Sequence, residues 1–155
     1  MKNNKKGTKT SVFGAGKREQ HDSSMFYSSK LYGDIKINEK IKEIHNIIDT
    51  KYVDNIICAD SRNMDFLPDS SVHLMITSPP YNVSKEYDKD LSLDEYKQLL
   101  EDVLSETYRV LVSGGRVCIN IANVGRKPYI PYHRYIMEII DKIGFIMRGE
   151  IIWNK

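Results

Sequence analysis

From about residue 37 onward, short apolar runs alternate with longer segments in which apolar residues recur every three or four positions. The short runs are rich in Ile and Val and are bounded by turn residues, which is typical of buried strands. The predicted strands cover residues 55–59, 72–77, 116–122 and 145–153.

The longer segments have the spacing of amphipathic helices with one apolar face. Ser92 followed by Glu95 forms a capping box, which predicts the start of a helix. Pro131 is well suited to open another helix, and Gly144 to cap its end. The predicted helical segments are residues 38–49, a short turn at residues 64–67, a helix from Ser92 that includes Leu111 and ends before Gly114, and a helix from Pro131 to Ile143.

Buried strands that alternate with amphipathic helices predict an α/β fold with a parallel sheet and right-handed crossovers. In such sheets the ligand crevice lies beyond the carboxyl ends of the strands. Three segments fall there: Asp60-Ser61, residues 78–81 and residues 123–127. We therefore expect these segments to lie at the crevice.

The composition is that of a soluble globular domain, with 41% hydrophobic and 28% charged residues in a chain of 155. No apolar run approaches the roughly 18 residues of a membrane span, so no membrane partner is predicted. Cys58 and Cys118 lie in apolar runs, which predicts reduced core residues in a cytoplasmic protein. The four histidines have no ligand spacing, so no metal site is predicted.

Charge is unevenly distributed along the chain, although the net charge is only +2. Residues 1–30 carry seven Lys or Arg against two acidic residues, and they show no sustained periodicity. Such a basic, mostly irregular arm could lie along nucleic-acid phosphates, or it could be a solubilising disordered tail. We expect this arm to precede a second part, residues 31–155.

The sharpest chemical signal is Ser78-Pro79-Pro80-Tyr81, directly after the predicted strand 72–77. The two prolines fix the backbone, so we expect its carbonyls to face the crevice or solvent. Ser78 adds a hydroxyl and Tyr81 a flat ring, a set that suits a planar base with an exocyclic amine. The alternative is a proline turn that merely ends a strand; its place at a crevice end favours the functional interpretation.

Residues 77–81, Thr-Ser-Pro-Pro-Tyr, resemble the catalytic motif of amino-group DNA methyltransferases, in the form typical of cytosine-N4 enzymes. Adenine-N6 relatives usually have Asp or Asn at the place of Ser78. The resemblance covers nearly the whole chain. The further matching segments are residues 12–16, 21–24, 26–27, 60–61, 67–72, 109–111, 114–115, 120–126 and 150–155.

The resemblance implies a Rossmann-like methyltransferase fold, S-adenosylmethionine as methyl donor, and double-stranded DNA as partner, with the target base flipped out. Ser78 Oγ and the Pro79 carbonyl would accept hydrogen bonds from the target amine, next to Pro80, and Tyr81 would stack on the base. Asp60, with Ser61 beside it, would accept from the adenine amino group of the cofactor. The alternative for Asp60 is a strand-end or helix-cap residue.

In this permuted class the catalytic half comes first, and a target-recognition region and a glycine-rich cofactor loop follow it. Neither is found before Lys155. We therefore expect a fragment, or half of a split enzyme whose partner is a missing C-terminal half or second subunit. By resemblance, the strand at residues 55–59 reaches the sheet only through strands of that half. The other three strands should pair as one sheet. The strand at residues 55–59 should remain unpaired, or move to a non-native place beside residues 72–77.

Three functions follow from these observations. The leading one is a cytosine-N4 DNA methyltransferase of a restriction-modification system. The second is an adenine-N6 enzyme of the same fold. The third is a DNA-binding remnant without catalysis, which would rely on the basic arm and bind DNA with steep salt dependence.

Overall fold

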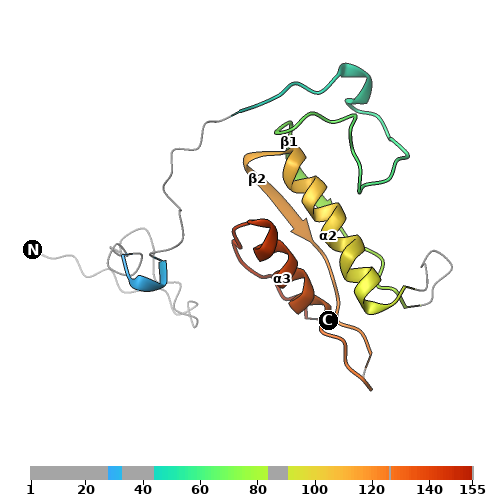
Figure 1. Ribbon diagram of the computed structural model, residues 1–155, viewed down its shortest axis with the longest axis vertical. Coiled ribbons are helices and arrows are strands. Elements are labelled where there is room, and N and C mark those ends of the chain that lie inside the picture. The colour runs from blue at the N-terminus through green and yellow to red at the C-terminus, as the bar shows by residue number, and fades with distance from the viewer. Residues whose placement is uncertain (1–27, 33–43, 84–90, 126, 155) are drawn as a thin grey trace, which may run out of the picture. The chain divides into compact units, whose positions relative to one another are not determined.

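The computed structural model describes residues 28–32, 44–83, 91–125 and 127–154 (Figure 1). The chain divides into two compact units, Met1–Lys40 and Ile41–Lys155. In the first unit the described part holds a single 3-10 turn, η2 (Lys30–Tyr32). The predicted basic arm lies almost entirely outside the described residues. The second unit contains η3 (Thr50–Tyr52), β1 (Val72–Thr77), α2 (Leu93–Val110), β2 (Leu111–Ile119) and α3 (Tyr132–Ile143).

β1 and β2 form a parallel two-stranded sheet, which confirms the predicted α/β class. β1 has the predicted bounds, because its apolar run ends abruptly at two prolines that cannot donate to a sheet ladder. The register shifts between Val72 and Leu74. Gly114 lies in β2 across from this irregularity, and its φ of 81° is a left-handed conformation that glycine adopts without strain.

Both helices pack on one face of this sheet (Figure 1). The predicted capping box is confirmed: the Ser92 hydroxyl accepts from the Glu95 N–H at 3.3 Å, and the Glu95 carboxylate accepts from the Ser92 N–H at 2.8 Å. Gly144 ends α3 with a φ of 105°, also as predicted. The buried core between the helices consists of Tyr96, Leu100, Leu104, Tyr132, Ile136, Ile139 and Ile140. Met75, Val117 and Ile119 of the strands pack against it.

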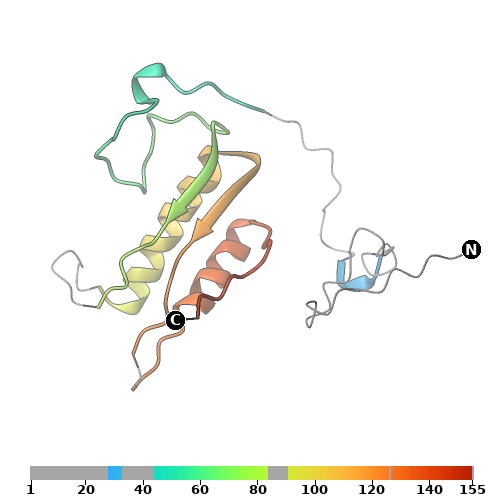
Figure 2. The ribbon, with the colours of Figure 1, turned by 180° about the vertical axis from the view of Figure 1, so that it is seen from behind.

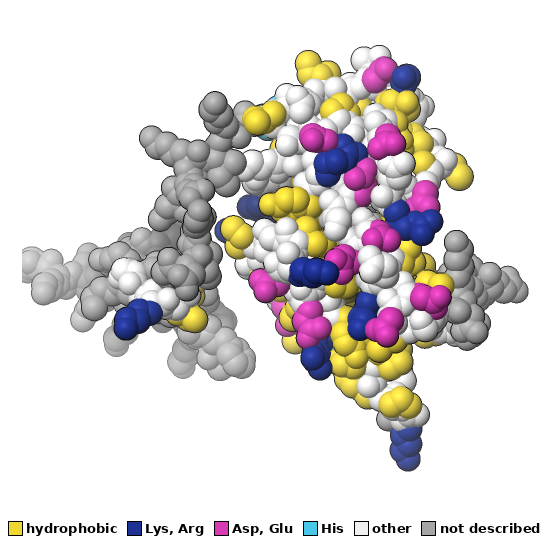
Figure 3. Space-filling view, viewed as in Figure 1, with side chains coloured by type: hydrophobic (Ala, Val, Ile, Leu, Met, Phe, Trp, Pro, Cys, Tyr) yellow, Lys and Arg dark blue, Asp and Glu magenta, His cyan; other side chains and the backbone are white. Residues whose placement is uncertain are grey.

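The outer surface of the helices carries interspersed acidic and basic side chains (Figure 3). One ion pair joins the two helices, between Lys142 Nζ of α3 and Glu101 Oε1 of α2 at 2.5 Å. Exposed pairs of this kind contribute little to stability. The helix surface is thus an ordinary solvent-facing one, and the stability of this layer comes from its buried side.

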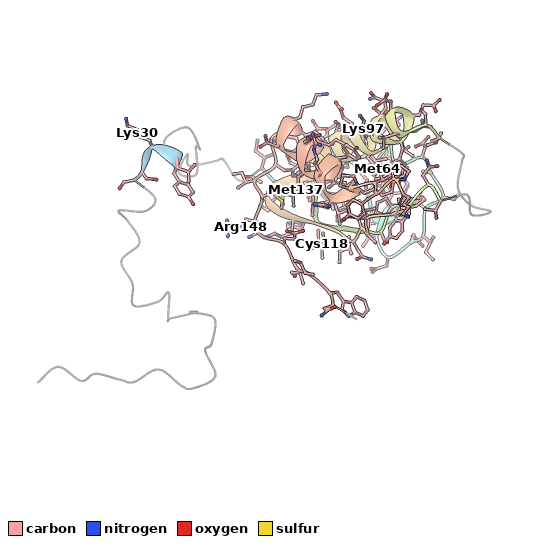
Figure 4. All side chains as sticks on the ribbon, turned by 90° about the horizontal axis from the view of Figure 1, so that it is seen from below. Lys30, Met64, Lys97, Cys118, Met137 and Arg148 are labelled. Atoms are coloured by element: carbon pink, nitrogen blue, oxygen red, sulfur yellow. The ribbon has the colours of Figure 1, made fainter. Side chains whose placement is uncertain are left out.

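The opposite face of the sheet is not covered by any element that the structure describes (Figure 2). Leu74 is 52% exposed and Ile76 71% exposed on this face. Cys118 is exposed there too, on the side of the sheet opposite to Lys97 of α2 (Figure 4). The prediction that Cys58 and Cys118 are core residues is therefore wrong, because both thiols are free and exposed.

Two predicted strands are not strands in the structure. Residues 55–59 have no strand partner, and Ile56 is fully exposed, which is the first of the two outcomes expected for this segment. Residues 145–153 were expected to join the sheet, and this is wrong: Ile151 is 97% exposed and unpaired. An apolar run becomes a strand only where a neighbour supplies the ladder hydrogen bonds.

Other predicted boundaries also differ from the structure. α2 ends at Val110 and β2 begins at once, because Leu111 is already extended (φ −72°, ψ 135°). β2 therefore covers Leu111–Ile119 rather than residues 116–122.

The helix predicted at residues 38–49 is not confirmed where it is described. Residues 44–49 are not helical: the backbone N–H of Asn46 instead donates to the Ser70 carbonyl at 2.9 Å. The rest of the helix predicted at residues 38–49 lies outside the described residues. Residues 64–67 form the predicted turn, closed by a bond from the Leu67 N–H to the Met64 carbonyl at 2.7 Å.

Candidate active site

The Ser-Pro-Pro-Tyr turn, residues 78–81, follows β1 directly and lines a hollow of its own, here called the Ser78 hollow. The end of β2 lies beside it. The Asn120 N–H donates to the Thr77 carbonyl at 2.9 Å, and Asn120 Nδ2 donates to Ser78 Oγ at 3.4 Å. The sheet therefore places the exposed Ser78 hydroxyl directly after β1, beside the polar side chain of Asn120 directly after β2.

The turn is also held by α2. The hydroxyl of Tyr96, in the first turn of this helix, donates to the Pro80 carbonyl at 2.5 Å. Tyr96 is only 2% exposed. The carbonyls of the turn were expected to face the crevice or solvent. For Pro80 this is wrong, because its carbonyl accepts a hydrogen bond from the buried Tyr96 hydroxyl of α2.

Asn82 closes the turn on its other side. Its carboxamide makes two bonds with the backbone of Leu91, donating to the carbonyl at 2.6 Å and accepting from the N–H at 3.1 Å. The φ of Asn82 is 50°, a left-handed conformation that Asn tolerates better than most residues. Since Leu91 immediately precedes the N-cap of α2, the start of this helix fixes both ends of residues 80–82.

The ring of Tyr81 lies between the hollow and the core. It lines the Ser78 hollow, is half-buried, and packs against the buried cluster of α2 and α3. Packing of this kind restricts the ring, so it offers a fixed apolar wall beside the Ser78 hydroxyl.

Asp60 lies in a second hollow, which it lines together with Arg62, Asn63, Asp102, Ser105, Glu106 and Arg109. Its carboxylate accepts from the guanidinium of Arg62 at 3.0 Å (Nε) and 2.5 Å (Nη2), and this bonding raises the pKa of Arg62. The structure thus does not bring Asp60 and Ser61 to the Ser78 hollow. The reason is that residues 55–59 are not paired into the sheet, so their carboxyl end is not at its edge.

Asn123, in the third segment expected at the crevice, caps the first turn of α3. Its Oδ1 accepts from the His133 backbone N–H at 3.1 Å and lies 2.7 Å from His133 Nδ1. Val124 and Ile130 form an antiparallel bridge that closes the loop before α3. Lys127 is exposed in this loop, and Arg126 lies outside the described residues.

Arg109 is a residue whose role the sequence pattern did not reveal. Its guanidinium donates to the carbonyls of Leu67 at 3.0 Å and Met64 at 3.1 Å. It also bonds the carboxylates of Asp69 at 2.6 Å and Glu106 at 2.6 and 2.9 Å. These bonds raise the pKa of Arg109 and hold the pKa of Glu106 below its ordinary value. Arg109 thereby ties the loop before β1 to the end of α2.

The described residues contain no cluster of His, Cys, Asp or Glu that could hold a metal ion. None of their helices is long and apolar enough to cross a membrane. The lining of the Ser78 hollow offers a hydroxyl and a backbone carbonyl as hydrogen-bond acceptors, beside an aromatic ring.

Curated relatives of the chain include several type II methyltransferases. M.MjaI of Methanocaldococcus jannaschii is 38% identical over 134 residues, which cover 64% of this chain and 44% of that protein. M.MjaVI of the same organism is 36% identical over 104 residues, covering 64% and 53%. M.ScaI of Streptomyces caespitosus is 36% identical over 93 residues, covering 57% and 29%. The chain thus spans about half, or less, of the length of these relatives.

A solved structure of a protein from Thermus thermophilus, assigned as a DNA modification methylase, matches the fold. The TM-score is 0.50 at 30% sequence identity, over 61% of this chain and 47% of that one. The DNA methylase family model for N6 and N4 methyltransferases matches residues 72–155, which include both strands, both helices and the Ser-Pro-Pro-Tyr turn. This match covers more than half of the sequence, so the chain belongs to the DNA methylase family.

Proposed function

We propose that the chain is the catalytic half of a site-specific DNA methyltransferase, which transfers a methyl group from S-adenosylmethionine to N4 of a flipped cytosine. The observation that carries this proposal is the Ser78 hollow at the carboxyl end of β1. A role in a restriction-modification system is supported by the type II methyltransferases among the relatives.

The Ser-Pro-Pro-Tyr turn would act by orienting the target amine. The N4 lone pair of cytosine is delocalised into the ring, so the amine is a poor nucleophile. Ser78 Oγ and the Pro79 carbonyl would accept from its two N–H groups and favour a more pyramidal nitrogen. When bound, S-adenosylmethionine supplies an electrophilic methyl group on sulfur, and the nitrogen attacks it in line.

Tyr81 would hold the flipped base. A base inside the duplex cannot reach the hollow, so the target nucleotide must leave the stack. Stacking on an aromatic side chain contributes roughly 1–3 kcal/mol per base, which offsets part of the cost of flipping. The half-buried ring of Tyr81 suits this role because its packing against the core fixes its place before the base arrives.

The residues that the structure describes fit the target amine better than they fit the methyl donor. The Ser78 hollow fits the accepting amine, as described above. Asp60 and Ser61 are proposed to bind the adenine of the cofactor, but the Asp60 carboxylate is paired with Arg62 in the second hollow. Binding the adenine amino group there would require Asp60 to share its oxygens between this amine and Arg62.

The proposal of cytosine-N4 specificity rests on Ser78. Adenine-N6 enzymes of this family usually have Asp or Asn at the corresponding position of the motif. The second candidate is adenine-N6 methylation, because the matching family model covers both N6 and N4 methyltransferases.

Methyl transfer tests the proposal directly. The chain is first completed with the half that supplies the glycine-rich loop and the recognition region. This completed enzyme is incubated with duplex DNA and S-adenosylmethionine labelled in its methyl group, and label in DNA is counted. Ser78→Ala is expected to slow transfer by about 10²–10³-fold while cofactor binding persists. Ser113→Ala, an exposed serine at the other end of the sheet, is the matched control and should keep the wild-type rate. A Ser78→Ala variant with full turnover would contradict the role of Ser78. Salt-dependent DNA binding without any transfer would instead indicate a binding remnant.

A further inference from the structure

Tyr96 has a polar atom that packing alone does not require. Its ring belongs to the buried cluster, 5.1 Å from the ring of Tyr132, and a phenylalanine would fill the same space. Yet its hydroxyl reaches out of the cluster to the Pro80 carbonyl at 2.5 Å. A buried hydroxyl group carries a desolvation cost that a hydrogen bond must offset. This bond therefore links the core of the helix layer to the turn that lines the Ser78 hollow.

The backbone of the turn shows which degree of freedom this bond controls. Proline fixes φ at both Pro79 and Pro80. A residue before proline is also restricted in ψ, and this applies to Ser78 and Pro79. Pro80 precedes Tyr81, so proline chemistry leaves its ψ unrestricted. The direction of the Pro80 carbonyl depends on that angle, and the Tyr96 hydroxyl holds this carbonyl.

Contacts at the two ends of the turn also hold it in place. The carboxamide of Asn82 is bonded twice to the backbone of Leu91, and the Ser92 capping box makes the start of α2 a well-defined support. On the other side of the turn, Asn120 of the β2 end donates to Ser78 Oγ. Each end of the turn thus has its own support, and Tyr96 holds its middle.

We propose that Tyr96 is a positioning residue for the Ser-Pro-Pro-Tyr turn. Its hydroxyl directs the Pro80 carbonyl toward α2, and this sets the peptide plane that joins Pro80 to Tyr81. As a result, the Ser78 hydroxyl and the Pro79 carbonyl are the acceptors presented to a target amine, and the Tyr81 ring is set beside them. The inference rests on the proposed function for its catalytic consequence, but the positioning itself is a property of this chain.

Tyr96→Phe tests the positioning because it removes the hydroxyl and keeps the ring. The readout is NMR of the 155-residue chain, with the Pro80 carbonyl carbon and the Tyr81 amide as probes. The expected result is an upfield shift of the Pro80 carbonyl and a change at Tyr81, with the resonances of α3 retained. Tyr108→Phe is the matched control, since this tyrosine lies at the far end of α2 with its ring against Phe145. It should leave both probes unchanged.

A second substitution covers the case in which Tyr96→Phe fails to fold. Replacement of Tyr96 by 3-fluorotyrosine keeps the hydroxyl and makes it a stronger donor. It should move the Pro80 carbonyl resonance downfield, opposite to the shift expected for phenylalanine. Unchanged Pro80 and Tyr81 resonances in a folded variant of either kind would overturn the inference.

The catalytic consequence is tested by measuring the rate of methyl transfer. Tyr96→Phe is expected to lower kcat by about 10–100-fold, as misplaced reacting groups do, while KM for DNA changes by less than about twofold. Shifted resonances together with an unchanged kcat would overturn the catalytic consequence. A completed wild-type enzyme that transfers no methyl group would contradict the proposed function, and the resonances of the 155-residue chain would still decide whether Tyr96 positions the turn.

Discussion

The acceptor at the Ser78 hollow is a hydroxyl whose surroundings are partly fixed. Asn120 Nδ2 donates to Ser78 Oγ at 3.4 Å. A hydroxyl oxygen has two lone pairs, so this bond does not exhaust its capacity to accept from a target amine. Pro79 supplies a second acceptor from a backbone that its ring makes stiff. Two acceptors are the number that the two N–H groups of an exocyclic amine require.

Tyr81→Ala should weaken the hold on a flipped base by roughly 1–3 kcal/mol. The substitution also removes packing against the core, because the ring is half-buried there. Binding is therefore measured on two duplexes, one with the target base paired and one with it mismatched. The packing loss affects both equally, whereas the mismatched base flips more easily and needs less help. The loss should be smaller on the mismatched duplex, and equal losses would count against stacking.

At the scale of elements, the sequence predicted the boundaries of a helix or strand well where residues close in sequence mark them. β1 ends at a proline pair, α2 begins at a capping box, and α3 lies between Pro131 and Gly144. The start of β2 was missed because Gly114-Gly115 resembles a helix stop, whereas Gly114 lies inside the strand with a positive φ. Residues 145–153 have the composition of a strand, but pairing depends on a neighbour that their own sequence does not specify.

The same reasoning separates the site residues. Ser78, Pro79 and Tyr81 could be proposed as candidates because the motif is continuous in sequence and follows a strand. The roles of Tyr96 and Arg109 could not, because the backbone carbonyls that they bond lie 16 to 45 residues away in sequence. The helix pattern identifies the two residues only as positions on α2. Asp60 was predicted at the crevice because it directly follows a predicted strand, but residues 55–59 are not part of the sheet that the structure describes.

The bond between Glu106 and Arg109 makes stability depend on pH. Arg109 holds the pKa of Glu106 below its ordinary value of 4.5. A carboxyl group with a lowered folded pKa stabilises the fold above its unfolded pKa, and that contribution is lost as pH falls through the folded value. The free energy of unfolding should therefore fall below about pH 4.5, and less steeply in Glu106→Gln.

Urea unfolding between about pH 3 and pH 7 checks this prediction. Glu138→Gln is the matched control, because this carboxylate pairs with Arg134 on the exposed surface of α3. At neutral pH, Glu106→Gln should cost about 1.5–3 kcal/mol, the range for hydrogen bonds to charged groups. Identical pH profiles for wild type and Glu106→Gln would show that the Arg109 contacts do not matter for folding.

At the scale of the whole second unit, the sheet has one covered and one uncovered face among the described residues. Met75 packs against the helices, while its neighbours Leu74 and Ile76 are 52% and 71% exposed. Parallel sheets are usually covered on both faces. An exposed apolar sheet face and unpaired strand edges favour self-association.

Ile76→Thr should reduce self-association and leave the free energy of unfolding within about 0.5 kcal/mol, since the residue is exposed and threonine also favours strands. Met75→Thr is the control on the covered face, and it should cost about 2 kcal/mol or more. Sedimentation velocity reports association, and urea unfolding reports stability. Comparable destabilisation by both substitutions would show that the second face is covered in solution.

The central claim is that the Ser78 hollow presents a cytosine amine for methylation. Analysis of the nucleosides from DNA treated with the completed enzyme and S-adenosylmethionine tests it most directly, because the product records the atom that was methylated. The account predicts N4-methylcytosine, formed by the wild type and lost by about 10²–10³-fold in Ser78→Ala. N6-methyladenine as the product would contradict the assignment of cytosine to this hollow.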